Sequence, residues 1–299
     1  MDNPIIFCIH DDSGNYWPNL FVALNSLLIN SSKKLRVYIL HNETLTKEAS
    51  NAIGKIAFKY EANLIFLSVD LPAVLKKTDF GHFSPASIFR LLVPQIFKDE
   101  ELIIYLDSDL IFHGIDILEI VKSASESPIS AVLDPYIGYS QKHKDQLLAL
   151  NLHPTDYFNS GLLVMRPNKI TFNLIEDFIE FLRENPVLGH PDQDFLNVKF
   201  KDVWGKLDSR YNHQACVFGG SLFMPLSSYF GKVIHYTGQI KPLKGYIAPA
   251  FIPFWMYASD LKKASEVFDT ATLTNLEPDP RNINNVVARR HSKQLFFGK

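Results

Sequence analysis

The chain has 299 residues, of which 46% are hydrophobic, and a formal net charge of −2. This predicts a globular protein with one large domain or a domain plus an extension, and the near-neutral charge argues against nucleic acid as a partner. Two cysteines, Cys8 and Cys216, provide no disulfide framework and suit a reducing compartment. We find no signal-peptide pattern and no run of roughly 18 apolar residues, so we expect a cytoplasmic protein.

The first part of the chain alternates between apolar runs and amphipathic segments. The apolar runs Ile5–Ile9, Leu35–Leu40 and Leu64–Leu67 are typical of buried strands. Apolar residues at helical spacing predict helices over Leu20–Leu28 and Thr46–Tyr60. This alternation indicates parallel crossovers and an α/β sheet, in which ligands bind at the carboxyl ends of the strands.

A further apolar run, Leu102–Leu106, leads directly into Asp107 and Asp109. The run predicts a strand buried on both faces. If the backbone stays extended, the two carboxylates point the same way and could hold a hard divalent cation. The alternative is that they are solvated turn residues, but the apolar residues that follow them disfavour an ordinary surface turn.

Ser84 and Pro85 open a short helix that carries Arg90 among apolar residues. Two interpretations of Arg90 stay open. Its side chain could snorkel to solvent or pair with an acid, or its guanidinium could face a phosphate or the acidic rim of the sheet.

The second half of the chain contains further strand and helix candidates. Ile129–Leu133 is a strand that ends in Asp134, and Leu162–Met165 is a strand preceded by a polar turn at Tyr157–Gly161. A helix is expected around residues 175–182, and another begins at His190–Asp194. Asp194 could be only a helix cap. Val233–Tyr236 is a late strand, and its His235 could be a buried core residue or a ligand.

The pattern weakens after about residue 260, so we expect one domain over 1–260 and a partly mobile C-terminal extension over 261–299. Arg289, Arg290 and Lys293 precede Leu295–Phe297. Basic residues beside apolar ones can contact an anionic membrane surface or a partner. A merely mobile terminus is the alternative.

Five stretches occur in an order that resembles glycosyltransferase family 8, the retaining nucleotide-sugar enzymes that include bacterial lipopolysaccharide galactosyl- and glucosyltransferases. They are Asp12–Tyr16, Tyr105–Asp109, Phe158–Gly161, Asp192–Asp194 and His235–Pro242. The resemblance implies a single Rossmann-like domain of the GT-A type, with a mixed, mostly parallel sheet and flanking helices.

The resemblance also implies roles for individual residues. Asp107, Asp109 and His235 would hold Mn²⁺ or Mg²⁺, a mixed oxygen and nitrogen site that suits these ions. The donor-binding residues implied are Asp11 or Asp12 at the edge of the uracil, Tyr16 on its face, Arg90, Asp107, Ser108, Asp134, Asn159, Gly238 and Lys241. Asp192 and Gln193 would lie by the anomeric carbon of the sugar, so the catalytic candidates are Gln193, Asp192 and Asp134.

We therefore expect a metal-dependent retaining glycosyltransferase that moves glucose or galactose from a UDP-sugar to a saccharide, glycolipid or glycoprotein. Gln193 is a poor nucleophile, which favours front-face attack by the acceptor hydroxyl. A nucleotide-sugar-binding protein without transfer activity is the alternative, and a hydrolase that uses Asp107 and Asp109 as acid and base is less favoured. The protein would act in the cytoplasm, with peripheral membrane contact through its C-terminal tail.

Overall fold

The computed structural model describes residues 2–76, 85–185, 188–216, 218–238, 240–244, 248–258 and 261. The first part of the chain forms the predicted parallel crossovers. Strands β1 (Pro4–Ile9), β2 (Arg36–His41) and β3 (Asn63–Ser68) pair in parallel. Helices α1 (Trp17–Ile29) and α2 (Lys47–Lys59) connect them. The Thr46 side chain accepts a hydrogen bond from the backbone N–H of Ala49 and so caps α2.

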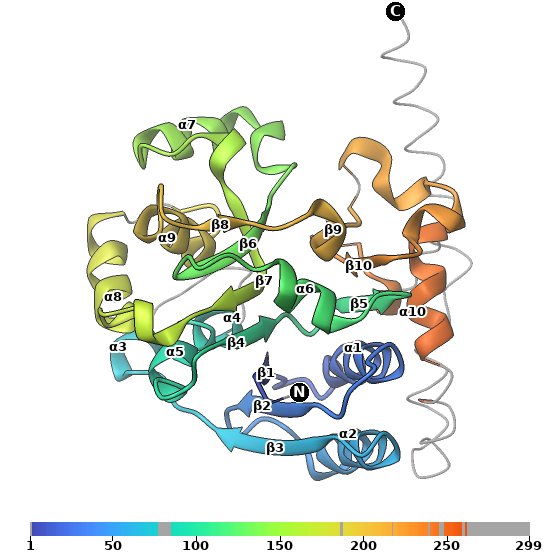
Figure 1. The fold of residues 1–299 in the computed structure, drawn as a ribbon. Helices are drawn as coiled ribbons and strands as arrows, with labels where there is room; N and C mark the ends of the chain where they lie inside the picture. Colours follow the sequence, from blue (N-terminus) through green and yellow to red (C-terminus); the bar gives the residue numbers. More distant parts are fainter. Residues whose placement is uncertain are drawn as a thin grey trace, which may run out of the picture.

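Seven strands form the main sheet, in the order β3-β2-β1-β4-β7-β6-β8 (Figure 1). Its second half contains β4 (Ile103–Leu106), β6 (Ile129–Leu133), β7 (Phe158–Met165) and β8 (Gly205–Lys206). β7 runs antiparallel to both β4 and β6, whereas the other pairs are parallel. The amino end of β7 therefore lies beside the carboxyl ends of β4 and β6. The expected mixed, mostly parallel sheet is confirmed.

A smaller sheet has the order β5-β10-β9. It consists of β5 (Leu110–His113), β10 (Lys232–His235) and β9 (His213–Gln214). Only the turn at Asp107–Asp109 separates β4 in the large sheet from β5 in the small one. The two carboxylates therefore lie where the chain passes from one sheet to the other.

Two apolar layers cover the two faces of the main sheet. On β1, Ile5 and Phe7 point into one layer, which includes α1, α2 and α10, and Ile6 and Cys8 point into the other, as the period of two in a strand requires. The remaining helices are α3 (Ala73–Lys76), α4 (Pro85–Phe89), α5 (Val93–Ile96), α6 (Ile117–Ser123), α7 (Gln141–Ala149), α8 (Leu174–Glu184), α9 (Pro191–Lys199) and α10 (Ile252–Tyr257). Figure 1 shows α3, α5 and α8 on the side of the sheet away from α1 and α2.

Two local expectations differ from the structure, and others lie outside its described residues. The polar segment predicted as a turn before Leu162 is instead the start of β7, because Asn159 and Ser160 bond to residues distant in sequence. Arg90 lies in the turn directly after α4 rather than on it. The Ser84 cap, the segment 262–299 and its proposed membrane contact lie outside the described residues. Within the described part of the chain, no helix is long and apolar enough to cross a membrane.

Candidate active site

A cavity of about 440 Å³ opens at the carboxyl ends of β1 and β4. This is the edge at which the sequence placed the ligand site. Seven of the predicted site residues line the cavity: Asp11, Asp12, Tyr16, Arg90, Asp107, Ser108 and Asp109.

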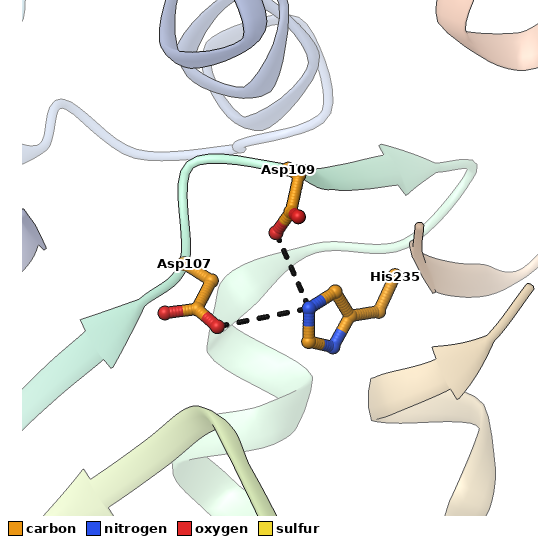
Figure 2. A group of neighbouring side chains, drawn as sticks. All are labelled: Asp107, Asp109 and His235. Carbon is orange, nitrogen blue, oxygen red and sulfur yellow. Dashed lines mark ion pairs between the residues drawn. The ribbon is translucent and has the colours of Figure 1, made fainter. Parts of the chain in front are cut away.

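Asp107, Asp109 and His235 converge at one end of this cavity (Figure 2). Nε2 of His235 lies 3.2 Å from Oδ1 of Asp109 and 3.7 Å from Oδ2 of Asp107. Asp109 is only 7% exposed, so the solvated-turn alternative is wrong. The carboxylates nevertheless meet through a turn and not along an extended strand, because β4 ends at Leu106.

A chain of side-chain amides orients the His235 ring. The backbone N–H of Gly161 donates to Oδ1 of Asn159 (2.9 Å), which also accepts a hydrogen bond from Nδ2 of Asn212 (2.9 Å). The carbonyl oxygen of Asn212 must then face His235, whose Nδ1 lies 2.9 Å away and donates to it. This leaves Nε2, the nitrogen that faces the two carboxylates, to bind a cation.

The absence of a side chain at Gly161 makes room for this cluster. A Cβ atom there would lie 2.2 Å from Cε1 of His235 and 2.8 Å from Oδ2 of Asp107. Real Cβ atoms essentially never come so close to other heavy atoms. Gly161 is therefore required by the close approach of β7 to the ring.

The three side chains fit a divalent cation. One ligand atom from each of Asp107, Asp109 and His235 lies within 4.8 Å of the others, and two carboxylates with one imidazole suit Mn²⁺ or Mg²⁺. The Lys241 ammonium forms an ion pair with Asp109. Burial alone would raise the pKa of the Asp109 carboxyl, but Lys241 and then His235 hold it well below its usual range. Asp109 is therefore an anion available to a metal at neutral pH.

Arg90 is buried and anchors the back of the cavity. Its guanidinium donates to Asp107 (2.9 Å) and to the backbone carbonyl of Ser160 (2.8 Å), and Nε lies 3.3 Å from Asp192. It also lies 4.8 Å from the centre of the Tyr105 ring. The snorkelling interpretation is therefore wrong: Arg90 pairs with acids and at the same time lines the cavity.

Asp134, Asn159 and Gln193 form a buried cluster beside the cavity. Oδ2 of Asp134 accepts from Asn159 and from Gln193, both at 3.2 Å. Oε1 of Gln193 accepts from the backbone N–H of Ser160 (2.9 Å). The antiparallel course of β7 brings Asn159 and Ser160 to this edge, where Asp134 follows β6.

The two acids at the start of α9 differ in their surroundings. Asp192 faces Arg90, yet burial raises the pKa of its carboxyl above the usual value. Asp194 accepts hydrogen bonds from the Tyr157 hydroxyl (2.7 Å) and the backbone N–H of His190 (3.0 Å). Asp194 therefore has a structural role, as the capping alternative predicted.

Asp11, Asp12 and Tyr16, from the loop between β1 and α1, also line the cavity. The Asp11 carboxylate accepts from the backbone N–H groups of Asn15, Tyr16 and Trp17 and so holds the loop that enters α1. The centre of the Tyr16 ring lies 5.8 Å from Nζ of Lys241, the partner of Asp109, so this loop adjoins the carboxylate–imidazole cluster.

Gly238 lies three residues after His235 in the sequence. Its φ of +80° favours glycine, and a Cβ atom there would meet nothing within 4 Å. The structure thus leaves open space at Gly238 but shows no contact to the cavity. The sequence did not predict three features of the site. These are the role of Asn212, the packing requirement for glycine at position 161, and the place of His10 in the lining of the cavity.

The mixed sheet, the cavity at its strand ends and the carboxylate–imidazole cluster agree with the GT-A fold that the resemblance implies. The model of glycosyl transferase family 8 matches residues 4–244, and the chain belongs to this family.

Curated proteins from bacteria and plants are similar to the chain. General stress protein A of Bacillus subtilis is 24% identical over 220 residues, which cover 71% of this chain and 74% of that protein. Galactinol synthase 5 of Arabidopsis thaliana is 29% identical over 217 residues, 67% of this chain and 64% of that protein. Glycosyltransferase GlyF of Streptococcus pneumoniae is 28% identical over 266 residues, 86% and 62% respectively. The chain thus spans less than two thirds of the plant and streptococcal proteins.

Solved structures share the fold. The galactosyltransferase LgtC in complex with donor and acceptor sugar analogues superposes with a TM-score of 0.70 at 21% identity, covering 86% of this chain and 95% of that one. GlyE of Streptococcus pneumoniae superposes with a TM-score of 0.63 at 20% identity, covering 90% and 64%. The GT-A fold expected from the sequence is confirmed.

Proposed function

We propose that the protein is a metal-dependent, retaining glycosyltransferase that moves galactose or glucose from a UDP-sugar to a saccharide, glycolipid or glycoprotein. The observation that supports this most is the convergence of Asp107, Asp109 and Nε2 of His235 on one point of the cavity. Membership of the family and the similarity to a galactinol synthase support transfer of a hexose.

The charges around the cluster suit a diphosphate leaving group. A bound cation would offset the negative charge that develops on the diphosphate as the sugar departs. Lys241 lies beside Asp109, so its ammonium can contribute a second positive charge at the same place. Burial alone would lower the pKa of Lys241, but Asp109 raises it. The lysine is therefore a cation throughout the neutral range.

The family resemblance favours retention, and the contacts of the nearby acids argue against a double displacement as its route. Asp134 accepts from Asn159 and Gln193, Asp192 pairs with Arg90, and Asp194 accepts from Tyr157. A double-displacement mechanism needs a carboxylate that is free to attack the anomeric carbon.

Both ends of the Gln193 amide are occupied as well. We favour attack by the acceptor hydroxyl on the face that the diphosphate leaves, with a phosphate oxygen of UDP taking the proton. Asp134, Asp192 and Gln193 would then position the sugar.

The proposal extends to where the enzyme acts. Arg289, Arg290 and Lys293 precede the apolar residues Leu295–Phe297, so we propose a cytoplasmic enzyme whose C-terminal tail contacts the inner face of the membrane. Deletion of residues 285–299 should leave turnover unchanged and reduce binding to anionic vesicles at low salt. Equal vesicle binding by both chains would refute the tail contact alone.

The main test is a screen of UDP-sugars for UDP release with Mn²⁺, with and without candidate acceptors. We expect release from UDP-glucose or UDP-galactose that stops on chelation and in the Asp109→Asn variant. Asp99→Asn, the same change at an exposed acid, is the matched control. Normal metal response of Asp109→Asn would refute the site. Metal-dependent UDP binding without transfer to any acceptor would favour a binding protein.

A further inference from the structure

Four large apolar side chains expose much of their surface where α1, β5, β10 and α10 meet. They are Ile29 (45% exposed), Phe230 (68%), Ile252 (43%) and Met256 (54%). Isolated exposed apolar residues are common on soluble proteins, whereas a group of them marks an interaction surface. We call these four residues the apolar patch.

A hydrogen-bonded network holds the members of the patch together. Nδ2 of Asn30 donates to the hydroxyl of Tyr257 (3.0 Å), and that hydroxyl lies 3.2 Å from Nδ1 of His113. The His113 ring packs edge-on against the ring of Phe230, with ring centres 5.5 Å apart. Two other patch residues directly precede Asn30 and Tyr257 in the sequence. Segments distant in sequence therefore bring their exposed apolar residues side by side (Figure 1).

The patch is ordered although it is exposed. The ring of Phe230 lies against Gly114, where an added Cβ atom would be 2.3 Å from Cε2 of that ring. Ile252 and Met256 are four residues apart on α10, so they share one face of this helix. A surface that is already ordered loses little conformational entropy when it binds a partner.

Two lysines border the patch. Lys33 is exposed in the loop that follows α1, and Lys232 lies opposite His113 in the ladder between β10 and β5. Among the residues that the structure describes, no carboxylate forms an ion pair with either lysine. Asp116 reaches the Lys33 loop, but its carboxylate accepts from the backbone N–H of Ser32 (2.9 Å) and caps α6. The two ammonium groups thus remain available to an anionic partner.

We propose that the apolar patch and its two lysines bind the surface of an anionic phospholipid bilayer. The apolar side chains would enter the interfacial layer of the lipid, and the ammonium groups would lie at the phosphates. This surface belongs to the folded domain and is separate from the C-terminal tail. The sequence continues after Leu261 with Lys262 and Lys263, which adds positive charge close to α10 along the chain.

A second copy of the chain fits this surface less well than a bilayer does. A two-fold interface brings the same surface of both copies together. Lys33 and Lys232 would then approach the same lysines of the other copy, without an unengaged acid to pair with them, and such contacts are unfavourable. An anionic bilayer instead offers phosphates at every position and attracts each lysine that approaches it.

The patch lies away from the carboxylate–imidazole cluster. β5 and β10 have four residues each. The pair His113 and Lys232 lies at the patch, whereas the pair Leu110 and His235 lies at the cluster. Three residue steps along a strand separate the two pairs, a distance of roughly 10 Å. Binding through the patch would therefore leave the cavity open, and changes in the patch should leave turnover unchanged.

The test is co-sedimentation of the full chain with vesicles of phosphatidylcholine and phosphatidylglycerol at low salt. We expect Phe230→Ala to weaken vesicle binding about tenfold, because a large apolar side chain no longer enters the lipid. Lys33→Gln should weaken it about fivefold, and this effect should disappear at high salt. Phe58→Ala and Lys55→Gln, which change exposed residues of α2, are the matched controls. Every variant keeps the C-terminal tail, so a loss of binding reports the patch.

A second change at the same position distinguishes lipid contact from support of the fold. Phe230→Trp should bind vesicles at least as well as the wild type, because tryptophan favours the membrane interface. Absence of wild-type binding, or equal binding by the wild type and Phe230→Ala, would overturn the inference. A dimer that Phe230→Ala dissociates, with vesicle binding unchanged, would assign the patch to a second copy. Metal-dependent UDP release, measured in the same variants, tests the proposed function independently.

Discussion

The backbone of Gly161 passes so close to the His235 ring that a methyl group on it would lie 2.2 Å from Cε1. We therefore predict that Gly161→Ala displaces the ring and weakens Mn²⁺ binding at least tenfold, measured by titration calorimetry. The control is Gly54→Ala in α2, where a Cβ atom meets nothing. That change should instead stabilise the protein by about 0.5–1 kcal/mol. Unchanged Mn²⁺ affinity in Gly161→Ala would show that the ring does not bind the ion.

Replacement of His235 distinguishes two roles for its side chain, that of a metal ligand and that of a buried core residue. We predict that His235→Ala strongly weakens Mn²⁺ binding and changes the melting temperature little, because the ring faces two carboxylates that a cation would bridge. Both quantities are measured on the same sample, by calorimetry and by thermal unfolding. A large loss of stability with Mn²⁺ affinity preserved would assign His235 to the core instead.

Asn212 should affect the metal without touching it. Its carbonyl accepts the Nδ1–H of His235, and loss of such a partner typically costs 10- to 100-fold in metal affinity. We predict this loss for Asn212→Ala, whereas Asn185→Ala, at the carboxyl end of α8, should have no effect on Mn²⁺ binding. If both variants bind Mn²⁺ like the wild type, the amide chain does not orient the ring.

Gln193 bears on the stereochemistry of transfer. Its amide bonds to Ser160 and Asp134 and not to the metal cluster. Gln193→Ala should therefore slow transfer strongly and leave UDP binding nearly normal. Proton NMR of the anomeric signal should show an α-linked product from an α-linked donor. A β-linked product would contradict retention.

The lowered pKa of the His213 ring predicts how the free energy of unfolding depends on pH. Burial, and then Lys232, lowers the pKa of the His213 ring to about 4. The unfolded chain, with an ordinary pKa near 6.5, binds the proton more readily than the folded chain between these values. This contribution is therefore fully present above pH 6.5 and is lost as the pH falls toward 4.

Because the His213 ring is partly exposed, we expect a loss of ~1–2 kcal/mol and not the full effect of the shift. Urea unfolding of the wild type and His213→Gln between pH 4 and 7.5 would measure it. The variant should depend less steeply on pH, with His153→Gln at an exposed position as control. Parallel pH profiles for the wild type and His213→Gln would contradict the prediction.

Local sequence signals were sufficient to predict the central sheet and the site residues that directly follow a strand. The apolar run before Asp107 and the alternation of strands and helices predicted β4, the parallel crossovers and the edge that holds the cavity. The convergence of Asp107 and Asp109 was also predicted, although a turn and not strand alternation produces it.

The remaining features depend on contacts between distant residues. The amino end of β7 looks like a turn because Asn159, Ser160 and Gly161 are polar or small, and only the fold supplies the partners that let a strand bury them. Asn212 lies in a polar stretch without periodicity, so nothing local marks it. Asp11 accepts hydrogen bonds from the backbone N–H groups of Asn15, Tyr16 and Trp17, and no residue pattern predicts these contacts.

The position of the Asp107–Asp109 turn between the two sheets has a mechanical consequence. Asp107 directly follows β4 of the large sheet, Asp109 directly precedes β5 of the small sheet, and His235 is the last residue of β10 in the small sheet. A cation bound by Asp107, Asp109 and His235 would connect the two sheets. Its binding free energy would then oppose their separation. Amide hydrogens of Leu110–His113 and Lys232–His235 would then exchange more slowly as Mn²⁺ is added, so the small sheet would report how much of the ion is bound.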